Sequence, residues 1–365
     1  MYFRFVHYGT GRTRRYCCDM WQQLKVLDLK IIFTSLDDIK LPFFKENALR
    51  SALGTSLRST ICVTPLRENC TGCDIENLCV YNKLFSHPPG GIQNTKTQNQ
   101  DIASLSSEFS PLPSSGRGQK ENLSPIYLSF FDPDTPLLIH PGEKFVLNLR
   151  LFGPAVAYFP YFYYCLENMA SRGLGLKDCN SKRGKFEMNE VIAKTPDGVE
   201  LPVYCKDKKC SPAGLHPFSL SDYIHNRTKV TALRIKTLSP LRLKHKNRLV
   251  SSPELHILLR ASLRRISDIY FKTIGKYPQI DYAKLVARAS ASSEITQPEG
   301  QWEWFDYDRY SSTQRTNMKL GGIVGDFVYR GELSDFYPFL KAGEVLAIGK
   351  GIAFGFGRYE IKIER

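Results

Sequence analysis

The feature that most constrains this chain is a glycine-rich segment followed by a short strand at the C-terminal end of the sequence. Residues 349–358 contain four glycines, and residues 359–363 then alternate between apolar and polar side chains. Glycine lets the backbone approach a ligand closely and can leave N–H groups open to phosphate. Because the segment precedes a strand and lacks a Gly-Lys-Ser/Thr ending, it is neither a Walker loop nor a dinucleotide-binding loop. The sequence therefore predicts a phosphate-compatible loop, flanked by Lys350 and Arg358, that closes a sheet.

Two successive runs of strand and helix patterns precede this loop. The first run has expected elements at 24–34, 45–59, 145–151, 158–169 and 186–192. The second has them at 230–238, 252–272, 302–309 and 323–329, with a short helix capped by Ser334 or Asp335. In the longer helix of the second run, Ser252 is the expected N-cap and Pro253 the first helical residue. Each half fits a β-α-β-β-α-β order, which is typical of a ferredoxin-like layer.

The chain is strongly basic, with 50 lysine and arginine residues, 36 acidic residues, a formal net charge of +14 and a pI near 9.2. Such an excess favours polyanionic partners, of which nucleic acid is the commonest. The alternative is a generally basic soluble protein, because charge by itself names no partner. No long apolar run occurs, either within the chain or after the arginines near its start. The sequence therefore predicts neither a membrane span nor a secretory signal.

Composition divides the 365 residues into two domains, together with an extension, an insertion and a linker. Residues 86–125 are dominated by Ser, Gln, Asn, Gly and Pro. They cannot bury enough apolar surface to offset the entropy of ordering, so we expect a disordered insertion there. The expected division is a disordered extension at 1–21, an N-terminal domain at 22–200, a linker at 201–228 and a C-terminal domain at 229–365.

Four of the ten cysteines lie close together, at Cys62, Cys70, Cys73 and Cys79. Without a secretory signal, such a cluster favours a metal site over disulfides. The two-residue spacing between Cys70 and Cys73 lets both thiolates bind one ion, and Cys62 and Cys79 would complete a tetrahedral set. The pattern predicts structural zinc first and an iron–sulfur cluster second. Free buried thiols are the remaining alternative.

Several motifs lead up to the terminal glycine loop in a definite order. The second half contains Leu238-Ser239-Pro240-Leu241-Arg242-Leu243, Leu263-Arg264-Arg265-Ile266, the polar run 306–315 and Gly321-Gly322-Ile323-Val324-Gly325. The first half contains Leu49-Arg50-Ser51-Ala52-Leu53-Gly54 and Gly173-Leu174-Gly175. In order and spacing these motifs resemble the RAMP superfamily of CRISPR-associated proteins, and particularly the Cas6-type endoribonucleases that process precursor CRISPR RNA. The resemblance covers most of residues 24–365.

This resemblance implies an α+β fold of two tandem ferredoxin-like (RRM-like, RAMP) domains with a basic cleft between them. It implies a metal-independent endoribonuclease that cuts CRISPR repeat RNA. In that reaction the ribose 2′-OH attacks the adjacent phosphate and leaves a 2′,3′-cyclic phosphate and a 5′-OH. Many relatives supply a histidine near the first helix, but this chain has none between His7 and His87. The candidate catalytic residues are therefore Lys45, Arg50, Arg58 and His87.

The resemblance also implies partners. CRISPR repeat RNA and the crRNA product are the expected ligands, subunits of an effector complex are further candidates, and the expected location is the prokaryotic cytoplasm. One alternative, favoured by the missing first-helix histidine, is a non-catalytic RAMP subunit that binds the crRNA handle. Another is a metal-cluster protein whose RNA binding is incidental. The candidate RNA-binding residues are Arg309, Tyr310, Ser311, Gln314, Arg315, Gly349, Lys350, Gly351, Gly355, Gly357 and Arg358.

Overall fold

The computed structural model of the protein describes residues 19–64, 70, 72–76, 78–85, 126–206, 215–224, 229–291, 297–311 and 316–364. The expected insertion at 86–125 lies outside these residues. Residues 19–23, partly assigned to a disordered extension by the sequence, form a helical turn with Met20 and Trp21 buried. None of the helices in the described part of the chain is long and apolar enough to cross a membrane.

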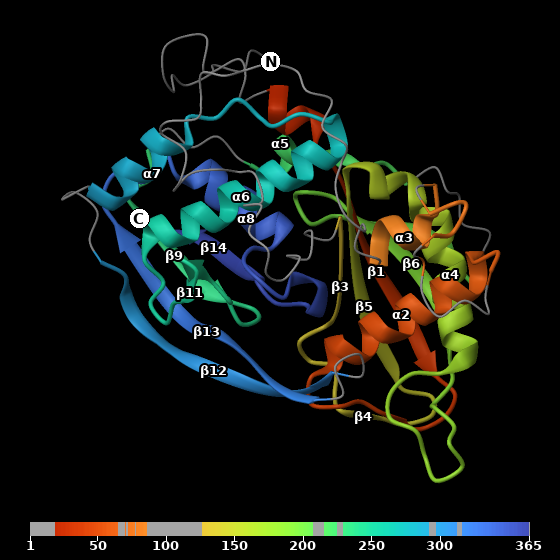
Figure 1. Cartoon of the computed structure of the whole chain (residues 1–365). Helices are drawn as coiled ribbons and strands as arrows, with labels where there is room; N and C mark the ends of the chain where they lie inside the picture. Colours follow the sequence, from red (N-terminus) through yellow and green to blue (C-terminus); the bar gives the residue numbers. More distant parts are fainter. Residues whose placement is uncertain are drawn as a thin grey trace.

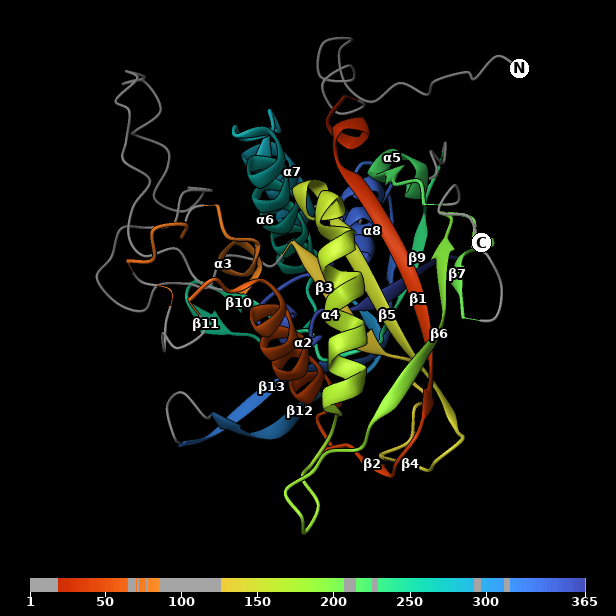
Figure 2. The same ribbon diagram turned by 90° about the vertical axis from the view of Figure 1, so that its right-hand side faces the viewer.

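The first of two main sheets is built around β1 (Figure 1). Most side chains of β1 are buried. Its main strands, in spatial order, are β3 (Tyr127–Phe131), β5 (Lys144–Phe152), β1 (Lys25–Ser35), β6 (Phe186–Lys194) and β7 (Glu200–Cys205). All pairings are antiparallel. Three helices lie on one side of this sheet (Figure 2): α2 (Lys45–Ile61), α3 (Val80–Phe85) and α4 (Phe159–Arg172).

Smaller elements complete the first half. The short strands β2 and β4 pair with each other, and β8 pairs with the start of β1. A 3-10 helix, η1, leads from β5 into α4, and the short helix α5 follows β8. Their bounds are β2 (Ile39–Lys40), β4 (Leu138–Ile139), η1 (Gly153–Tyr158), β8 (Phe218–Ser219) and α5 (Leu220–Tyr223).

The second main sheet has four antiparallel strands. In spatial order they are β12 (Glu299–Ser311), β13 (Thr316–Arg330), β9 (Ala232–Thr237) and β14 (Tyr359–Ile363). The helices of this half are α6 (Leu255–Ile274), α7 (Tyr282–Ala291) and α8 (Tyr337–Leu346). β13 pairs with β9 only over residues 326–330. The rest of β12 and β13 extends beyond the sheet as a curved ribbon (Figure 1).

The two sheets share one topology. In each half the first strand is central, the third and fourth strands flank it, and the second strand lies outside the third. A helix follows the first and the third of these strands. This strand order with two crossover helices defines a ferredoxin-like unit. The α+β fold with two tandem ferredoxin-like units, expected from the sequence, is confirmed.

Three expectations about element boundaries were wrong. The helix expected from Ser252 begins at Leu255 with Glu254 as its N-cap, because the Pro253 carbonyl accepts a hydrogen bond from the Tyr329 hydroxyl. The helix expected to be capped by Ser334 or Asp335 begins at Tyr337, and its N-cap, Phe336, makes no side-chain cap. All of β7 except its first residue, and all of β8, fall within the stretch 201–228 that was interpreted as a linker, but both strands pair with the first sheet.

A buried arginine joins the two halves. Arg150, on β5, donates from Nη1 to the carbonyl of Val345 at 2.8 Å and lies 2.5 Å from the Asp28 carboxylate through Nη2. Arg265, on α6, donates from Nε to the carbonyl of Leu346 at 3.0 Å. Both cations therefore satisfy carbonyls at the C-terminal end of α8, where a helix dipole favours positive charge. The first half thereby binds directly to a helix of the second.

Candidate functional site

The glycine loop between α8 and β14 folds back onto the protein. Lys350 donates its backbone N–H to the carbonyl of Arg242 at 2.8 Å, and Gly357 donates to the carbonyl of Pro240 at 3.0 Å. The Arg358 N–H donates to the hydroxyl of Ser239 at 3.0 Å. The loop is thus held by the motif that follows β9. Several of the N–H groups that the sequence offered to phosphate are bonded within the protein.

At two positions of the loop, Gly355 and Gly357, the surroundings leave no room for a larger residue. Gly355 has a φ of 80°, and a Cβ there would lie 2.6 Å from Cγ of Glu46 on α2. Gly357 has a φ of 83°, and a Cβ there would lie 1.9 Å from the carbonyl oxygen of Ile348. Both positions need a left-handed backbone and close contact, which only glycine combines at low cost. Glycine serves here to pack the second half against the first.

Arg358 lies inside this contact. Its Nη2 is 3.7 Å from the Glu46 carboxylate, and its Nε donates to the carbonyl of Gly355 at 3.1 Å. The guanidinium stacks 4.1 Å from the ring centre of Phe130, and the side chain is only 11% exposed. Burial lowers the pKa of Arg358, while Glu46 opposes this effect. Arg358, expected to bind RNA, therefore directs its charge to Glu46 rather than to the surface.

The catalytic candidates on α2 have separate surroundings. Lys45 donates from Nζ to the carbonyl of Thr135 at 2.6 Å. Arg50 donates to the Tyr127 hydroxyl at 3.1 Å, and its guanidinium lies 5.4 and 5.6 Å from the ring centres of Phe85 and Phe354. Burial raises the pKa of Tyr127 to about 12. Arg58 lines the cysteine pocket instead. The structure therefore does not gather these three cations at one point.

An exposed basic hairpin begins where the glycine loop meets the chain after β9. It consists of β10 (Lys244–His245) and β11 (Arg248–Leu249), joined by Lys246 and Asn247 with φ values of 47° and 61°. Two consecutive positive φ values are the geometry of a tight type I′ hairpin turn. The side chains of Lys244, Lys246 and Arg248 are exposed. The hairpin therefore presents three cations to solvent.

A pair of histidines lies at the base of this hairpin. The rings of His245 and His256 are 5.3 Å apart between centroids and nearly perpendicular, at 86°. The Nδ1 atom of His256 is 3.4 Å from the carboxylate of Glu254, and the His256 side chain is 17% exposed. Burial, with smaller contributions from His245 and Arg260, lowers the pKa of His256, whereas Glu254 opposes the shift. His256 is therefore favoured in its neutral form, which can accept a proton.

Sequence reasoning did not find this pair. No sequence pattern connected His256, near the start of the helix expected at 252–272, with His245. The signal was the Lys246-Asn247 dipeptide, because two residues that tolerate a left-handed backbone between short polar strands indicate a hairpin. A hairpin there returns the chain toward the start of α6.

The other RNA-binding candidates belong to the polar run 306–315 or to the glycine loop. The backbone of Arg309, Tyr310 and Ser311 belongs to β12, but their side chains, and all of Gln314, Arg315 and His87, lie outside the described residues. Nearer the sheet, Tyr307 packs against Phe44 and Phe356, with ring centres 5.1 and 5.7 Å apart. The ribbon therefore touches both the start of α2 and the glycine loop.

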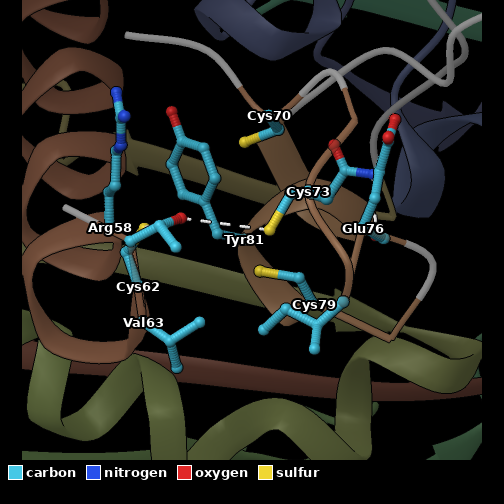
Figure 3. A pocket seen from close by; sticks show the side chains of 11 residues that line it. Arg58, Cys62, Val63, Cys70, Cys73, Glu76, Cys79 and Tyr81 are labelled. Carbon is cyan, nitrogen blue, oxygen red and sulfur yellow. Dashed lines mark hydrogen bonds between the residues drawn. The ribbon is translucent and has the colours of Figure 1, made fainter. Parts of the chain in front are cut away.

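The four clustered cysteines line one pocket beside the end of α2 (Figure 3). Arg58 and Tyr81 line the same pocket. Among the described residues, no three His, Cys, Asp or Glu side chains already stand in a metal-binding arrangement. The structure thus gathers the predicted cysteine ligands around one space without placing their sulfur atoms in final coordination geometry.

Two family models match the sequence. The family AF_1859_N, an N-terminal domain, matches residues 24–214, and the family described as CRISPR-associated endoribonuclease Cas6 matches residues 235–359. A comparison with curated proteins found no match.

Among solved structures, the chain is similar to a partial Cas6-RT-Cas1–Cas2 complex, with a TM-score of 0.51 and 12% identity over 93% of this chain. It spans only 46% of that protein's length. It is also similar to a product complex of a Thermus thermophilus Cas6, with a TM-score of 0.50 and 12% identity, over 93% of this chain and 99% of the other. These likenesses concern the fold.

Two ferredoxin-like units in tandem, with a glycine loop before the final strand, form the fold that this chain shares with the solved Cas6 structures. The two family models, one for each half of the sequence, then identify the families. The chain belongs to the AF_1859_N family over residues 24–214, just over half of its length, and carries a domain of the CRISPR-associated endoribonuclease Cas6 family at residues 235–359.

Proposed function

We propose that this protein binds CRISPR repeat RNA and cuts it to release crRNA. The observation that carries the proposal is the His245–His256 pair, which lies beside three exposed cations in the half that matches the Cas6 model. Two imidazoles beside a cationic surface suit the acid–base chemistry of phosphodiester cleavage. The same cations would hold the RNA backbone, whose charge dominates binding of nucleic acid.

In the proposed reaction the ribose 2′-OH attacks the adjacent phosphate. Neutral His256 accepts the proton of the 2′-OH, and protonated His245 donates a proton to the departing 5′-oxygen. The P–O5′ bond breaks as the new P–O2′ bond forms, which leaves a 2′,3′-cyclic phosphate and a 5′-OH. Lys244, Lys246 and Arg248 stabilise the negative charge that develops on the phosphorane. No metal takes part in this chemistry.

The earlier candidates keep a smaller role in the proposal. Lys45 and Arg50 each have a partner in the first half, so we assign them to placing α2 and the glycine loop rather than to proton transfer. Arg50, through its contact with Phe354, would set how the two halves meet. A basic cleft between the halves remains the expected path of the RNA, which is consistent with how A-form RNA is recognised by shape and backbone.

The test uses end-labelled repeat RNA in excess EDTA, alongside the same RNA with a 2′-deoxy nucleotide at the cut site. We expect cleavage of the all-ribose RNA only, with products that carry 2′,3′-cyclic phosphate ends. Equal cleavage of both RNAs would rule out the 2′-OH mechanism. Binding at low salt without any cleavage would instead support a non-catalytic RAMP subunit, an alternative favoured by the absence of a histidine from α2.

A further inference from the structure

The segment that joins α2 to α3 brings four cysteines together from separate positions. Cys62 directly follows α2 as its C-cap, Cys70 and Cys73 lie in the loop, and Cys79 directly precedes α3. Figure 3 shows the sulfur atoms of Cys70, Cys73 and Cys79 projecting from the loop, across from the end of α2 where Cys62 lies. The space enclosed by the pocket is about 20 Å³, which suits a single small ion and not an organic ligand.

The backbone of the loop is folded as a ligand-bearing turn. The N–H of Cys73 donates to the carbonyl of Cys70 at 3.2 Å, and Gly72 between them has a φ of 70°. A second turn follows, in which the N–H of Cys79 donates to the carbonyl of Ile75 at 2.8 Å. A Cys-x-x-Cys turn of this kind places two thiols on the same side of the chain, where both can bind one ion.

These cysteines do not behave as packing residues. A free cysteine usually acts as a small apolar residue and is buried. Cys165, on α4, fits that description, because it is fully buried and burial raises its pKa to about 12. The four cysteines of the pocket are all partly exposed instead. Packing therefore accounts for Cys165 and leaves the cluster unexplained.

The segment also lacks an apolar core that would hold it in place. Among the described residues between 62 and 83, no side chain is buried, and Val63 and Leu78 are 68% and 76% exposed. Short segments without a core are commonly held by a disulfide or a metal. The cysteines are free thiols, so a disulfide does not supply the constraint.

We propose that Cys62, Cys70, Cys73 and Cys79 bind one structural Zn²⁺ as thiolates. Tetrahedral zinc with Zn–S bonds of about 2.3 Å needs sulfur atoms about 3.8 Å apart. Cys62 Sγ and Cys73 Sγ each lie 3.9 Å from the hydroxyl oxygen of Thr64, which stands between them. Binding therefore requires the Thr64 hydroxyl to leave the space between these two sulfur atoms, and it releases the thiol protons to solvent.

The ion would fix α3 at one end of its length. At the other end, Phe85 packs on Gly54 of α2, where an added Cβ would lie 3.0 Å from the Phe85 ring. Phe85 also contacts Arg50 and Tyr127. Zinc at the Cys79 end and Phe85 at the other would hold α3 across α2. The site is structural and separate from the proposed cleavage chemistry.

The experiment measures metal in the full-length protein, purified under reducing, anaerobic conditions. Elemental analysis of the wild type, Cys73→Ser and the matched control Cys179→Ser gives the zinc and iron content. Cys179 is also a free cysteine, but it is exposed and lies in a different loop. We expect about one zinc per chain in the wild type and the control, and at most one tenth of that in Cys73→Ser.

A second readout does not depend on how well the variant folds. Titration of wild-type protein with a mercurial reagent, in the presence of a zinc-sensitive dye, should release all the zinc as four thiols react. Cobalt-substituted protein should show the absorption typical of tetrahedral thiolate coordination. Stoichiometric iron, together with the visible absorption of an iron–sulfur cluster, would show that the site holds such a cluster and would overturn the zinc proposal. No metal in the wild type, or equal zinc in Cys73→Ser, would overturn the proposal. None of these readouts depends on RNA cleavage.

Discussion

Each half of the molecule has a loop at the same place in its topology, and the two loops differ in where their side chains lie. The loop joins α4 to β6 in the first half and α8 to β14 in the second. In the first half, residues 173–185 expose Lys177, Lys182 and Arg183 to solvent. In the second half, residues 347–358 turn inward, and Gly355 is buried against Glu46. Equivalent position in a ferredoxin-like unit therefore does not imply equivalent exposure.

Glycine has the same purpose in both loops. Gly175 and Gly184 pack against the backbone near β2, where an added Cβ would lie 2.4 Å from a carbonyl oxygen in each case. Gly355 and Gly357 pack in the same way against α2 and Ile348. What distinguishes the loops is where their cations go. The first loop leaves them at the surface, whereas the second directs Arg358 to Glu46.

The largest predicted effect concerns a feature that the second half has and the first lacks. His256→Ala should lower the single-turnover rate of repeat cleavage by about 10²–10⁴-fold, because a general base is lost. The matched control is His140→Ala, whose ring in the first half pairs with Asp38 at an exposed position. Rapid-quench assays on labelled RNA measure both rates, and equal rates in the two variants would remove the histidine pair from the mechanism.

The same pair predicts a pH dependence. Burial, His245 and Arg260 lower the pKa of His256 and Glu254 opposes them, so the neutral base persists to lower pH than for an ordinary histidine. The limb of the wild-type rate profile that rises with pH should therefore lie below the usual histidine pKa, about 6.5, and the rate should fall again at higher pH because the reaction also needs a protonated acid. Glu254→Gln removes the opposing charge and should move this rise to lower pH. A profile unchanged by Glu254→Gln would contradict the assignment.

The next effect concerns the link between the halves. Arg150→Met leaves the Asp28 carboxylate buried without its cation and should cost about 3–5 kcal/mol of unfolding free energy. Arg330→Ala breaks ion pairs within the second half whose side chains are mostly exposed, so it should change stability by less than about 0.5 kcal/mol. Urea denaturation of both variants makes the measurement. Similar values would mean that Arg150 does not join the halves.

Glycine packing predicts a smaller difference. Gly357→Ala should destabilise the protein by about 3 kcal/mol, through a left-handed alanine and a forced contact with Ile348. Gly198, in the first half, has a φ of 87° and no atom within 4 Å of an added Cβ. Gly198→Ala should therefore cost only about 1 kcal/mol, the backbone contribution. Thermal melting compares the two, and equal shifts would show that close packing at Gly357 is unimportant.

The smallest effect concerns charge. Removing two exposed cations in Lys182→Ala/Arg183→Ala should reduce the slope of log affinity against log salt by about 1–2, because fewer phosphates are neutralised. Lys362→Ala removes an exposed cation on β14 of the second main sheet, next to Glu360, and should leave the slope nearly unchanged. Filter binding across a salt series gives both slopes. An effect of Lys362→Ala as large as that of the double variant would show that the loop has no special role.

The periodic elements could be predicted, because strand and helix patterns are local. The expected strand at 24–34 corresponds to β1, and the helix expected at 252–272 corresponds to α6 (Leu255–Ile274). Helix starts were wrong because distant residues occupy the capping groups. Ser334 accepts a hydrogen bond from the Val230 N–H and bonds to Glu332, while Asp335 pairs with Arg288.

The candidate site was predicted less well. The cysteines were found because their spacing is local, and the structure gathers all four around one pocket. The inward fold of the glycine loop depends on Glu46, some 300 residues away, and no local pattern reveals such a contact. The arrangement of His245 with His256 depends on a hairpin turn whose two central residues carry only a weak signal.

Arg50 contacts both the helix that follows the cysteines and the glycine loop, so its position can couple the two. Its guanidinium contacts both Phe85 of α3 and Phe354 of the glycine loop. An event that orders either ring lowers the free-energy cost of ordering the other, and such coupling is reciprocal. If bound zinc raises the affinity of the protein for RNA that spans the halves, then that RNA must raise the affinity for zinc by the same factor.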